Sequence, residues 1–219
     1  MKGLFQKLNH EFKRGSILNK IIYINIGFFL IISILESFAF IIQFNIKPTL
    51  ATLYLPADTK EIISKPWTFL TYMFLHNNIL HLIVNMMWLY FSGNIFLKQL
   101  TPKQFLESYI LGGVCGGLLF VIAYNYIPSL SIYMLNAKAL GSSAAVLAIV
   151  VASATYLPNY KVSVPFIGFI KLKSIAIICV LLDIISIPNG NTGGHIAHIG
   201  GALFGYIYIK QLKNKFQYH

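Results

Sequence analysis

Long apolar runs of about 20 residues alternate with short polar connections along most of this chain. A helix of that length, rising about 1.5 Å per residue, crosses roughly 30 Å of hydrocarbon. Because lipid offers no partners to backbone groups, we expect an all-α polytopic membrane protein, a bundle of six transmembrane helices. The expected spans are residues 21–44, 78–97, 104–125, 140–157, 168–187 and 194–210.

The connection between the first two spans, residues 45–77, is unusually long. A connection of this length is uncommon unless it is functional or partly structured. Its apolar stretches predict that it embeds in part in the outer membrane interface. We therefore expect a basic N-terminal segment, residues 1–20, followed by one membrane domain, residues 21–212.

Composition and charge support this picture. The 219 residues are 57% hydrophobic and only 11% charged, which is too apolar for a soluble domain. The net charge of +11 does not predict nucleic-acid binding, because the basic residues lie near the ends of the apolar runs. With a cytoplasmic N-terminus, only Lys47, Lys60, Lys65 and Lys138 fall outside, which favours both termini in the cytoplasm.

The first apolar run is too long for a signal peptide and lacks a small-residue cleavage site. The brevity of the chain and the missing targeting signal favour the bacterial plasma membrane. Cys115 and Cys179 lie in different apolar runs, where free cysteines pack as small hydrophobes. We therefore expect no disulfide. The chain also lacks the His-Glu-x-x-His pattern of zinc proteases, so we expect no metal, and we expect no cofactor.

Polar side chains near the outer ends of the fourth and sixth spans form the candidate site. Ser143 lies about three residues into its span and follows Gly141, which allows other backbone to approach closely. A serine hydroxyl attacks well only when a base takes its proton, and His198 is the candidate base. Both spans run inward, so the two side chains share a depth. Alone, a serine in an apolar helix is far more often a small packing residue than a nucleophile, and it is the context of Ser143 that favours catalysis.

Small residues after His198 predict close helix packing. Gly201 and Gly205 follow it on roughly the same helix face, so the sixth span can pack tightly on the fourth. His195, one turn before His198, is a rival base. We favour His198, because His195 lies nearer the surface and, in part, because of the family resemblance described below.

Other polar residues in the spans have candidate roles. His81 and Asn85 share one face of the second span, where they can join the Ser143 backbone N–H in binding an oxyanion. The alternative is a polar clamp between helices. Asp183 is either a third member that orients a histidine or a structural residue, and we favour a pair without it. Glu36 has no assigned role.

Taken in order, these motifs resemble the rhomboid intramembrane serine proteases in their six-helix bacterial form. The resemblance runs from about Trp67 to Gly205. It rests on a His-x-x-x-Asn at His81, a Gly-x-Ser at Gly141 and an Ala-His-x-Gly-Gly-x-x-x-Gly that begins at Ala197. Each motif is weak alone, but three of them on the expected spans make a specific pattern.

The resemblance implies that Ser143 is the nucleophile and His198 the base of a dyad that needs no acid. It implies that His81 and Asn85 help to form the oxyanion site, and that residues 45–77 are the family's outer loop. The implied substrates are other membrane proteins within the lipid bilayer, cut in or near a transmembrane helix at small residues.

The sequence departs from the family pattern at several positions. Ala144 replaces a glycine, Thr68 replaces the arginine of a Trp-Arg pair, Leu147 replaces an aromatic residue, and a glutamate is missing around Leu97. These changes bear on loop stability and turnover but leave the serine and histidine intact. The alternative is a catalytically inactive relative that binds membrane helices. A transporter would instead gather its polar residues at the midplane.

Overall fold

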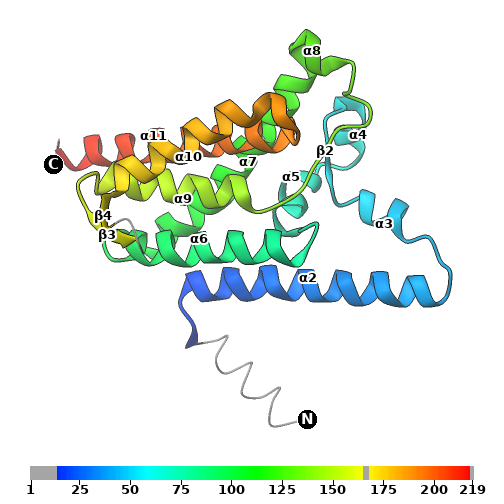
Figure 1. Cartoon of the computed structure of the whole chain (residues 1–219), viewed down its shortest axis with the longest axis horizontal. Coiled ribbons are helices and arrows are strands. Elements are labelled where there is room, and N and C mark those ends of the chain that lie inside the picture. Colours follow the sequence, from blue (N-terminus) through cyan, green and yellow to red (C-terminus); the bar gives the residue numbers. More distant parts are fainter. Residues whose placement is uncertain (1–13, 165–167, 218–219) are drawn as a thin grey trace.

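The computed structural model describes residues 14–164 and 168–217, and these form a bundle of six long helices (Figure 1). The prediction of an all-α polytopic membrane bundle is confirmed. Most of the predicted basic N-terminal segment, residues 1–13, lies outside the described residues. The long helices are α2 (Ile17–Ile41), α6 (Ile79–Leu97), α7 (Pro102–Tyr126), α9 (Ser143–Tyr156), α10 (Leu172–Ser186) and α11 (Thr192–Gln217).

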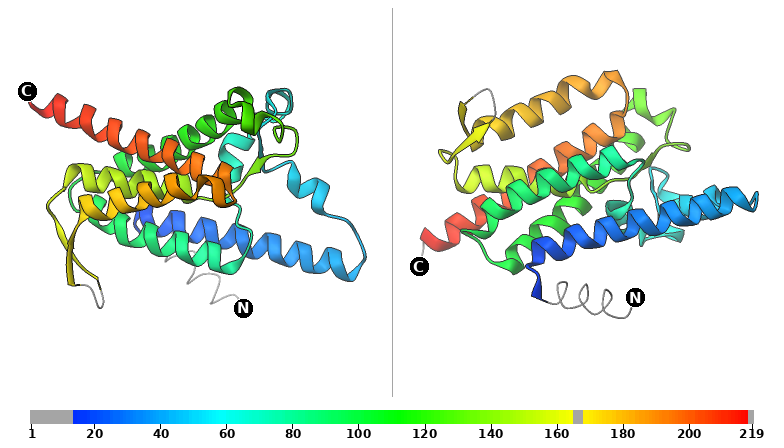
Figure 2. Two further views of the ribbon diagram at one scale, coloured as in Figure 1. Left: turned by 45° about the horizontal axis from the view of Figure 1, so that its top comes forward. Right: turned by 60° about the horizontal axis from the view of Figure 1, so that its bottom comes forward.

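Successive long helices run in opposite directions, so the start of α2 and the end of α11 face the same end of the bundle (Figures 1 and 2). That end also carries an antiparallel hairpin of β3 (Lys161–Val164) and β4 (Gly168–Lys171), and we call it the hairpin end. The opposite end carries short helices and loops, and we call it the loop end.

The helix limits differ from the predicted spans by a few residues, most clearly at the starts of the first and fifth spans. Helix α2 begins at Ile17 rather than residue 21, because the Ser16 hydroxyl caps it by accepting the Asn19 N–H at 3.2 Å. The fifth predicted span, residues 168–187, is wrong at its start. Gly168 takes a φ of +96°, which no α-helix contains, and the residues after it pair in the hairpin.

Four described helical segments are long and apolar enough to cross a membrane: α2, α6, α7 and the segment Leu172–Asn189, which joins α10 to η2 (Ile187–Asn189). Helix α9 is apolar but has 14 residues, which rise only about 21 Å against roughly 30 Å of hydrocarbon. The connection before α9 folds over its start and contains α8 (Pro128–Ser131) and β2 (Lys138–Ala139).

Helix α9 is the centre of the bundle. Its residues Ala144 to Ala154 are all buried, and it packs against α6, α7, α10 and α11. A helix enclosed on every side is expected to be apolar around its whole circumference, as this one is.

Glycines on the neighbouring helices determine how closely they approach α9. A Cβ added to Gly201 would collide with the Ala144 carbonyl, and one added to Gly205 would collide with the Ala148 carbonyl. A Cβ on Gly116 of α7 would lie 2.6 Å from the Ala144 methyl group. Helix α11 therefore meets α9 backbone to backbone, and Gly116 of α7 packs on an alanine methyl group of α9, both of which require glycine at the contact.

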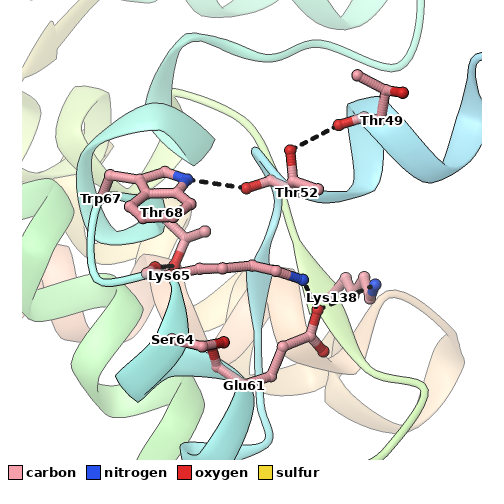
Figure 3. Close-up of polar contacts among 8 residues, drawn as sticks. All are labelled: Thr49, Thr52, Glu61, Ser64, Lys65, Trp67, Thr68 and Lys138. Carbon is pink, nitrogen blue, oxygen red and sulfur yellow. Dashed lines mark hydrogen bonds and ion pairs between the residues drawn. The ribbon is translucent and has the colours of Figure 1, made fainter.

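The outer connection, residues 45–77, is built from short elements rather than a free loop. They are α3 (Lys47–Ala51), β1 (Leu55–Pro56), α4 (Thr59–Ser64), α5 (Thr68–Thr71) and η1 (Tyr72–Phe74). Figure 3 shows Trp67 donating its indole N–H to the Thr52 carbonyl at 3.0 Å, and the Thr52 hydroxyl bonding to the Thr49 carbonyl at 2.7 Å.

This connection also holds the chain that leads into α9. Strand β1 pairs antiparallel with β2. The Glu61 carboxylate lies 2.7 Å from the Lys65 ammonium and 3.7 Å from that of Lys138 on β2 (Figure 3). The outer connection thus braces the segment just before Ser143.

We expect Gly201→Leu to lower the unfolding temperature of the purified protein in detergent. Overpacking typically costs about 1–3 kcal/mol, and here the obstacle is backbone that cannot rotate away. Gly27→Leu is the matched control, because a Cβ at Gly27 meets nothing within 4 Å. Equal unfolding temperatures for the two variants would contradict the close packing of α11 on α9.

We expect Glu61→Gln to destabilise the protein at neutral pH by less than about 1 kcal/mol, because the ion pairs are partly exposed. The hydrogen bond from Lys65 holds the pKa of Glu61 below its usual value of 4.5. The stabilisation is therefore complete above that value and is lost as the pH falls through the lowered pKa.

Unfolding temperatures across pH 3.5 to 8 should therefore show the two proteins converging at the acid end. Asp58→Asn is the control, because either side chain caps α4 by accepting the Lys60 N–H. A gap between Glu61→Gln and wild type that is constant down to the acid end would contradict the ion-pair interpretation.

Candidate active site

Ser143 is the first residue of α9, not the third or fourth as predicted. The reason lies in Gly141, whose φ of +123° cannot continue into a helix and suits glycine alone. The Gly141 N–H donates to the Tyr72 carbonyl at 2.9 Å, which ties this turn to the outer connection. Ser143 therefore follows a sharp backbone turn and begins a buried helix.

His198 lies directly beside Ser143. Its Nε2 is 2.6 Å from the serine Oγ, a hydrogen-bond distance between two different helices. His195, the rival base, is one turn earlier on α11, and its Nδ1 lies 2.8 Å from a carboxylate oxygen of Asp183. The structure thus brings His198, rather than His195, to the serine.

Asp183 contacts both histidines through one carboxylate oxygen. Its Oδ1 is 2.7 Å from His198 Nδ1 as well as 2.8 Å from His195 Nδ1, and the residue is 8% exposed. When Nδ1 of His198 donates to this carboxylate, Nε2 is left to accept a proton from serine. The dyad without an acid stays a prediction, and Asp183 lies where the third member of a Ser-His-Asp triad would lie.

The same three residues have the spacing of a metal-ligand set. The ligand atoms of Asp183, His195 and His198 all lie within 4.8 Å of one another. Their mutual hydrogen bonds account for this grouping. The expectation that the chain uses no metal stays a prediction.

His81 lies on the other side of the serine. Helix α6 begins where the Asn78 side chain accepts the His81 N–H at 2.8 Å, and this cap places His81 in the first turn. The imidazole packs on Gly141, where an added Cβ would lie 2.9 Å from His81 Cε1 and 3.6 Å from Ser143 Oγ. The glycine thus leaves room for the ring next to the hydroxyl.

Asn85, one turn further along α6, is 5% exposed, and its Nδ2 has no hydrogen-bond partner in the part of the chain that the structure describes. A buried donor left unpaired costs about 1–3 kcal/mol, so such groups invite an explanation. A hydrogen-bond acceptor on a bound substrate would pair with the Asn85 Nδ2 group and explain why it is unpaired here.

The start of α9 provides further donors. The first α-helical bond there is donated by the Val146 N–H to the Ser142 carbonyl at 2.9 Å, and no side chain caps the helix. The N–H groups of the first turn, that of Ser143 included, have no partner within the helix. They also lie at the positive end of the helix dipole, which favours a negative oxygen.

His76 lies in the outer connection, and Glu36, to which the sequence assigned no role, lies in α2. His76 Nε2 lies 3.1 Å from the Ser142 hydroxyl, and its ring meets that of His81 with centroids 5.1 Å apart. Burial lowers the pKa of His76 to about 4, so its ring is neutral at pH 7. Glu36 lines a separate cavity of about 140 Å³ together with His76 and Tyr54.

The positions that depart from the family pattern have packing roles here. Thr68 is fully buried, and its hydroxyl donates to the Lys65 carbonyl at 2.8 Å. The Ala144 methyl group fills the space left by Gly116. Leu147 is buried within an apolar cluster formed by α6, α9, β3, α10 and α11.

A cavity of about 390 Å³ opens beside Ser143 at the loop end. Its walls come from α7, α9, α11, β2 and the turn before α11. Residues that line it include Gly141, Phe120, Asn191 and Ala197. The serine is therefore reachable by a chain segment that enters from this end.

Comparison with known proteins agrees with this architecture. Residues 64–214 match the family model of the Rhomboid domain. A 140-residue stretch, 62% of this chain, is 31% identical to presenilin-associated rhomboid-like protein A, mitochondrial, of Danio rerio, and covers 35% of it. A 161-residue stretch, 69% of this chain, is 27% identical to RHOMBOID-like protein 12, mitochondrial, of Arabidopsis thaliana, and covers 48% of it.

A third relative carries a different description. Over 65 residues, 30% of this chain, the sequence is 35% identical to 18% of inactive RHOMBOID-like protein 8 of Arabidopsis thaliana. The chain spans about a third to a half of the length of the two mitochondrial relatives. The family match covers well over half of the chain, and its bounds enclose α6 through most of α11. The chain therefore belongs to the Rhomboid family.

Proposed function

We propose that this protein is an intramembrane serine endopeptidase that cleaves transmembrane segments of other membrane proteins. The observation that carries the proposal is the 2.6 Å contact between Ser143 Oγ and His198 Nε2 at the start of a short, buried helix. A nucleophile and a base within hydrogen-bond reach, with the base held by a third group, are the parts that acyl transfer needs.

In the proposed mechanism, His198 takes the hydroxyl proton as Ser143 Oγ attacks the scissile carbonyl carbon. The protonated imidazole then gives that proton to the leaving amine, and an acyl-enzyme remains. Water, activated by the same histidine, releases the new carboxyl end. Asp183 accepts the Nδ1 proton of His198 in a hydrogen bond, fixes the tautomer and stabilises the imidazolium.

The negative oxygen of the tetrahedral intermediate needs donors that are in place before reaction. The backbone N–H of Ser143, the unpaired Nδ2 of Asn85 and the ring of His81 supply them in this proposal. Among the side chains, Asn85 has the strongest support as an oxyanion donor, because its Nδ2 group is buried and has no hydrogen-bond partner among the described residues.

The substrate must present an extended stretch, because a helical peptide bond is shielded by its own hydrogen bonds. The cavity of about 390 Å³ at the loop end receives that stretch beside the serine. The partners are thus other membrane proteins within the bilayer. We place the reaction below the membrane surface at the loop end, because α9 is too short to carry its first residue to the level of the longer helices.

Domain limits and location are part of the same proposal. We infer that residues 21–212 form one membrane domain and that residues 1–20 form a basic cytoplasmic segment. The start of α2 and the end of α11 lie at the hairpin end, where most of the lysines gather, which supports cytoplasmic termini. The bacterial plasma membrane stays a prediction, whereas both longer matches above are to proteins named as mitochondrial.

A second candidate is a helix-binding relative without activity. It is favoured by the short match to a protein named as inactive. The intact contact between serine and histidine argues for catalysis instead.

We expect the purified protein to cut a model transmembrane substrate in detergent, and Ser143→Ala and His198→Ala to reduce the rate to background. The reason is that the two residues act as a unit. Ser153→Ala is the matched control, since it lies on the same helix with its hydroxyl bonded to the Ser92 carbonyl. Absence of cleavage by wild type, with substrate still bound, would favour the inactive alternative.

We expect Asp183→Asn to lower kcat by about 10² to 10⁴-fold with little change in KM, because the amide no longer fixes the productive tautomer of His198. Steady-state kinetics on the same substrate provide the measurement. Asp58→Asn is the control, a carboxylate-to-amide change in the outer connection. Wild-type kcat in Asp183→Asn would show that the serine and histidine work without the acid.

We expect Asn85→Ala to lower kcat by about 10² to 10³-fold, the usual effect of removing one oxyanion donor. Asn94→Ala on the same helix is the control, because its amide is exposed and bonds only to the Tyr90 carbonyl among the described residues. A loss of stability without a loss of kcat would instead support the polar clamp between helices.

A further inference from the structure

A groove of about 570 Å³ lies toward the hairpin end of the bundle, away from Ser143. It runs between α9, α10 and α11. Apolar side chains form most of its walls, and Ile177 of α10 is 56% exposed there. The apolar residues that line it are Val151, Ala154, Ala176, Ile177, Val180 and Leu181.

Positive charge gathers at one end of this groove. Lys173, Lys210 and Lys213 line it, and in the adjacent hairpin Lys161 stands directly opposite Lys171. Like charges that face each other across two strands are destabilising unless something neutralises them. None of the ion pairs found among residues 14–164 and 168–217 involves these lysines, and no acidic side chain lines the groove.

The three lining lysines are not equivalent. The Lys213 ammonium donates to the carbonyls of Thr155 and Tyr156 at 2.9 and 3.0 Å, so it already serves to cap the end of α9. Lys173 is exposed at the start of α10, and Lys210 is exposed with its ammonium 5.7 Å from the centre of the Tyr206 ring. Lys173 and Lys210 therefore remain available to an external anion.

We propose that this groove binds one anionic phospholipid. Lys173 and Lys210 hold its phosphate, and an acyl chain lies along the apolar walls toward Leu181. Basic pockets between transmembrane helices are suited to acidic headgroups, and long lysine side chains reach the headgroup level from within the membrane. A soluble phosphate could pair with the lysines but would leave the apolar walls of the groove uncovered. The lysines and the apolar walls together therefore favour a lipid.

The test is native mass spectrometry of the detergent-solubilised full chain, with phosphatidylglycerol or phosphatidylcholine added in equal amounts. We expect wild type to retain phosphatidylglycerol several-fold more than phosphatidylcholine. The double variant Lys173→Gln/Lys210→Gln should lose most of that preference. The double variant Lys20→Gln/Lys98→Gln is the control, because it removes the same charge outside the groove.

Two results of the lipid comparison would overturn the proposal. One is equal retention of the two lipids by wild type. The other is the same loss in both double variants, which would assign the preference to overall charge. An excess of inorganic phosphate should not displace the lipid, and displacement would show that the site recognises the anion alone. Unfolding temperatures of the variants, expected to match wild type without lipid, exclude a folding defect as the cause.

Discussion

The contact between the backbones of α9 and α11 is the constraint on which the rest of this structure depends. Gly201 and Gly205 lie against the carbonyls of Ala144 and Ala148, at a separation that no side chain would permit. His198 precedes this contact by one turn, so the same approach carries its ring to Ser143. Close packing of small residues, which stabilises helices in lipid, here also brings the proposed base to the serine.

The start of α9 is the second element of the arrangement. Gly141 turns the chain sharply, and the helix that follows is buried and short, so its first residue is recessed while its first N–H groups stay uncapped. The outer connection compensates for this irregular turn with the β1–β2 pair, the bond from Gly141 to Tyr72 and the ion pairs of Glu61. The outer connection and the start of α9 are therefore linked into one structure at the loop end.

Helix α10 links the two ends of the molecule. Near the loop end it carries Asp183, which meets both histidines of α11. Near the hairpin end, α10 lines the groove that also contains Lys173, Lys210 and Lys213. Much of its surface is exposed and apolar, as at Ile177 and Leu181, which suits contact with lipid.

The sequence by itself determined the bundle, the approximate spans and the residue types of the site, because apolar run length and glycine spacing follow directly from membrane thickness and helix geometry. Only the tertiary structure decided that the fifth helix starts at Leu172, that Ser143 begins its helix, and that Asp183 stands behind His198. These depend on backbone turns and on the rotation of one helix against another. Neither is encoded in local periodicity, since many rotations bury the same apolar face.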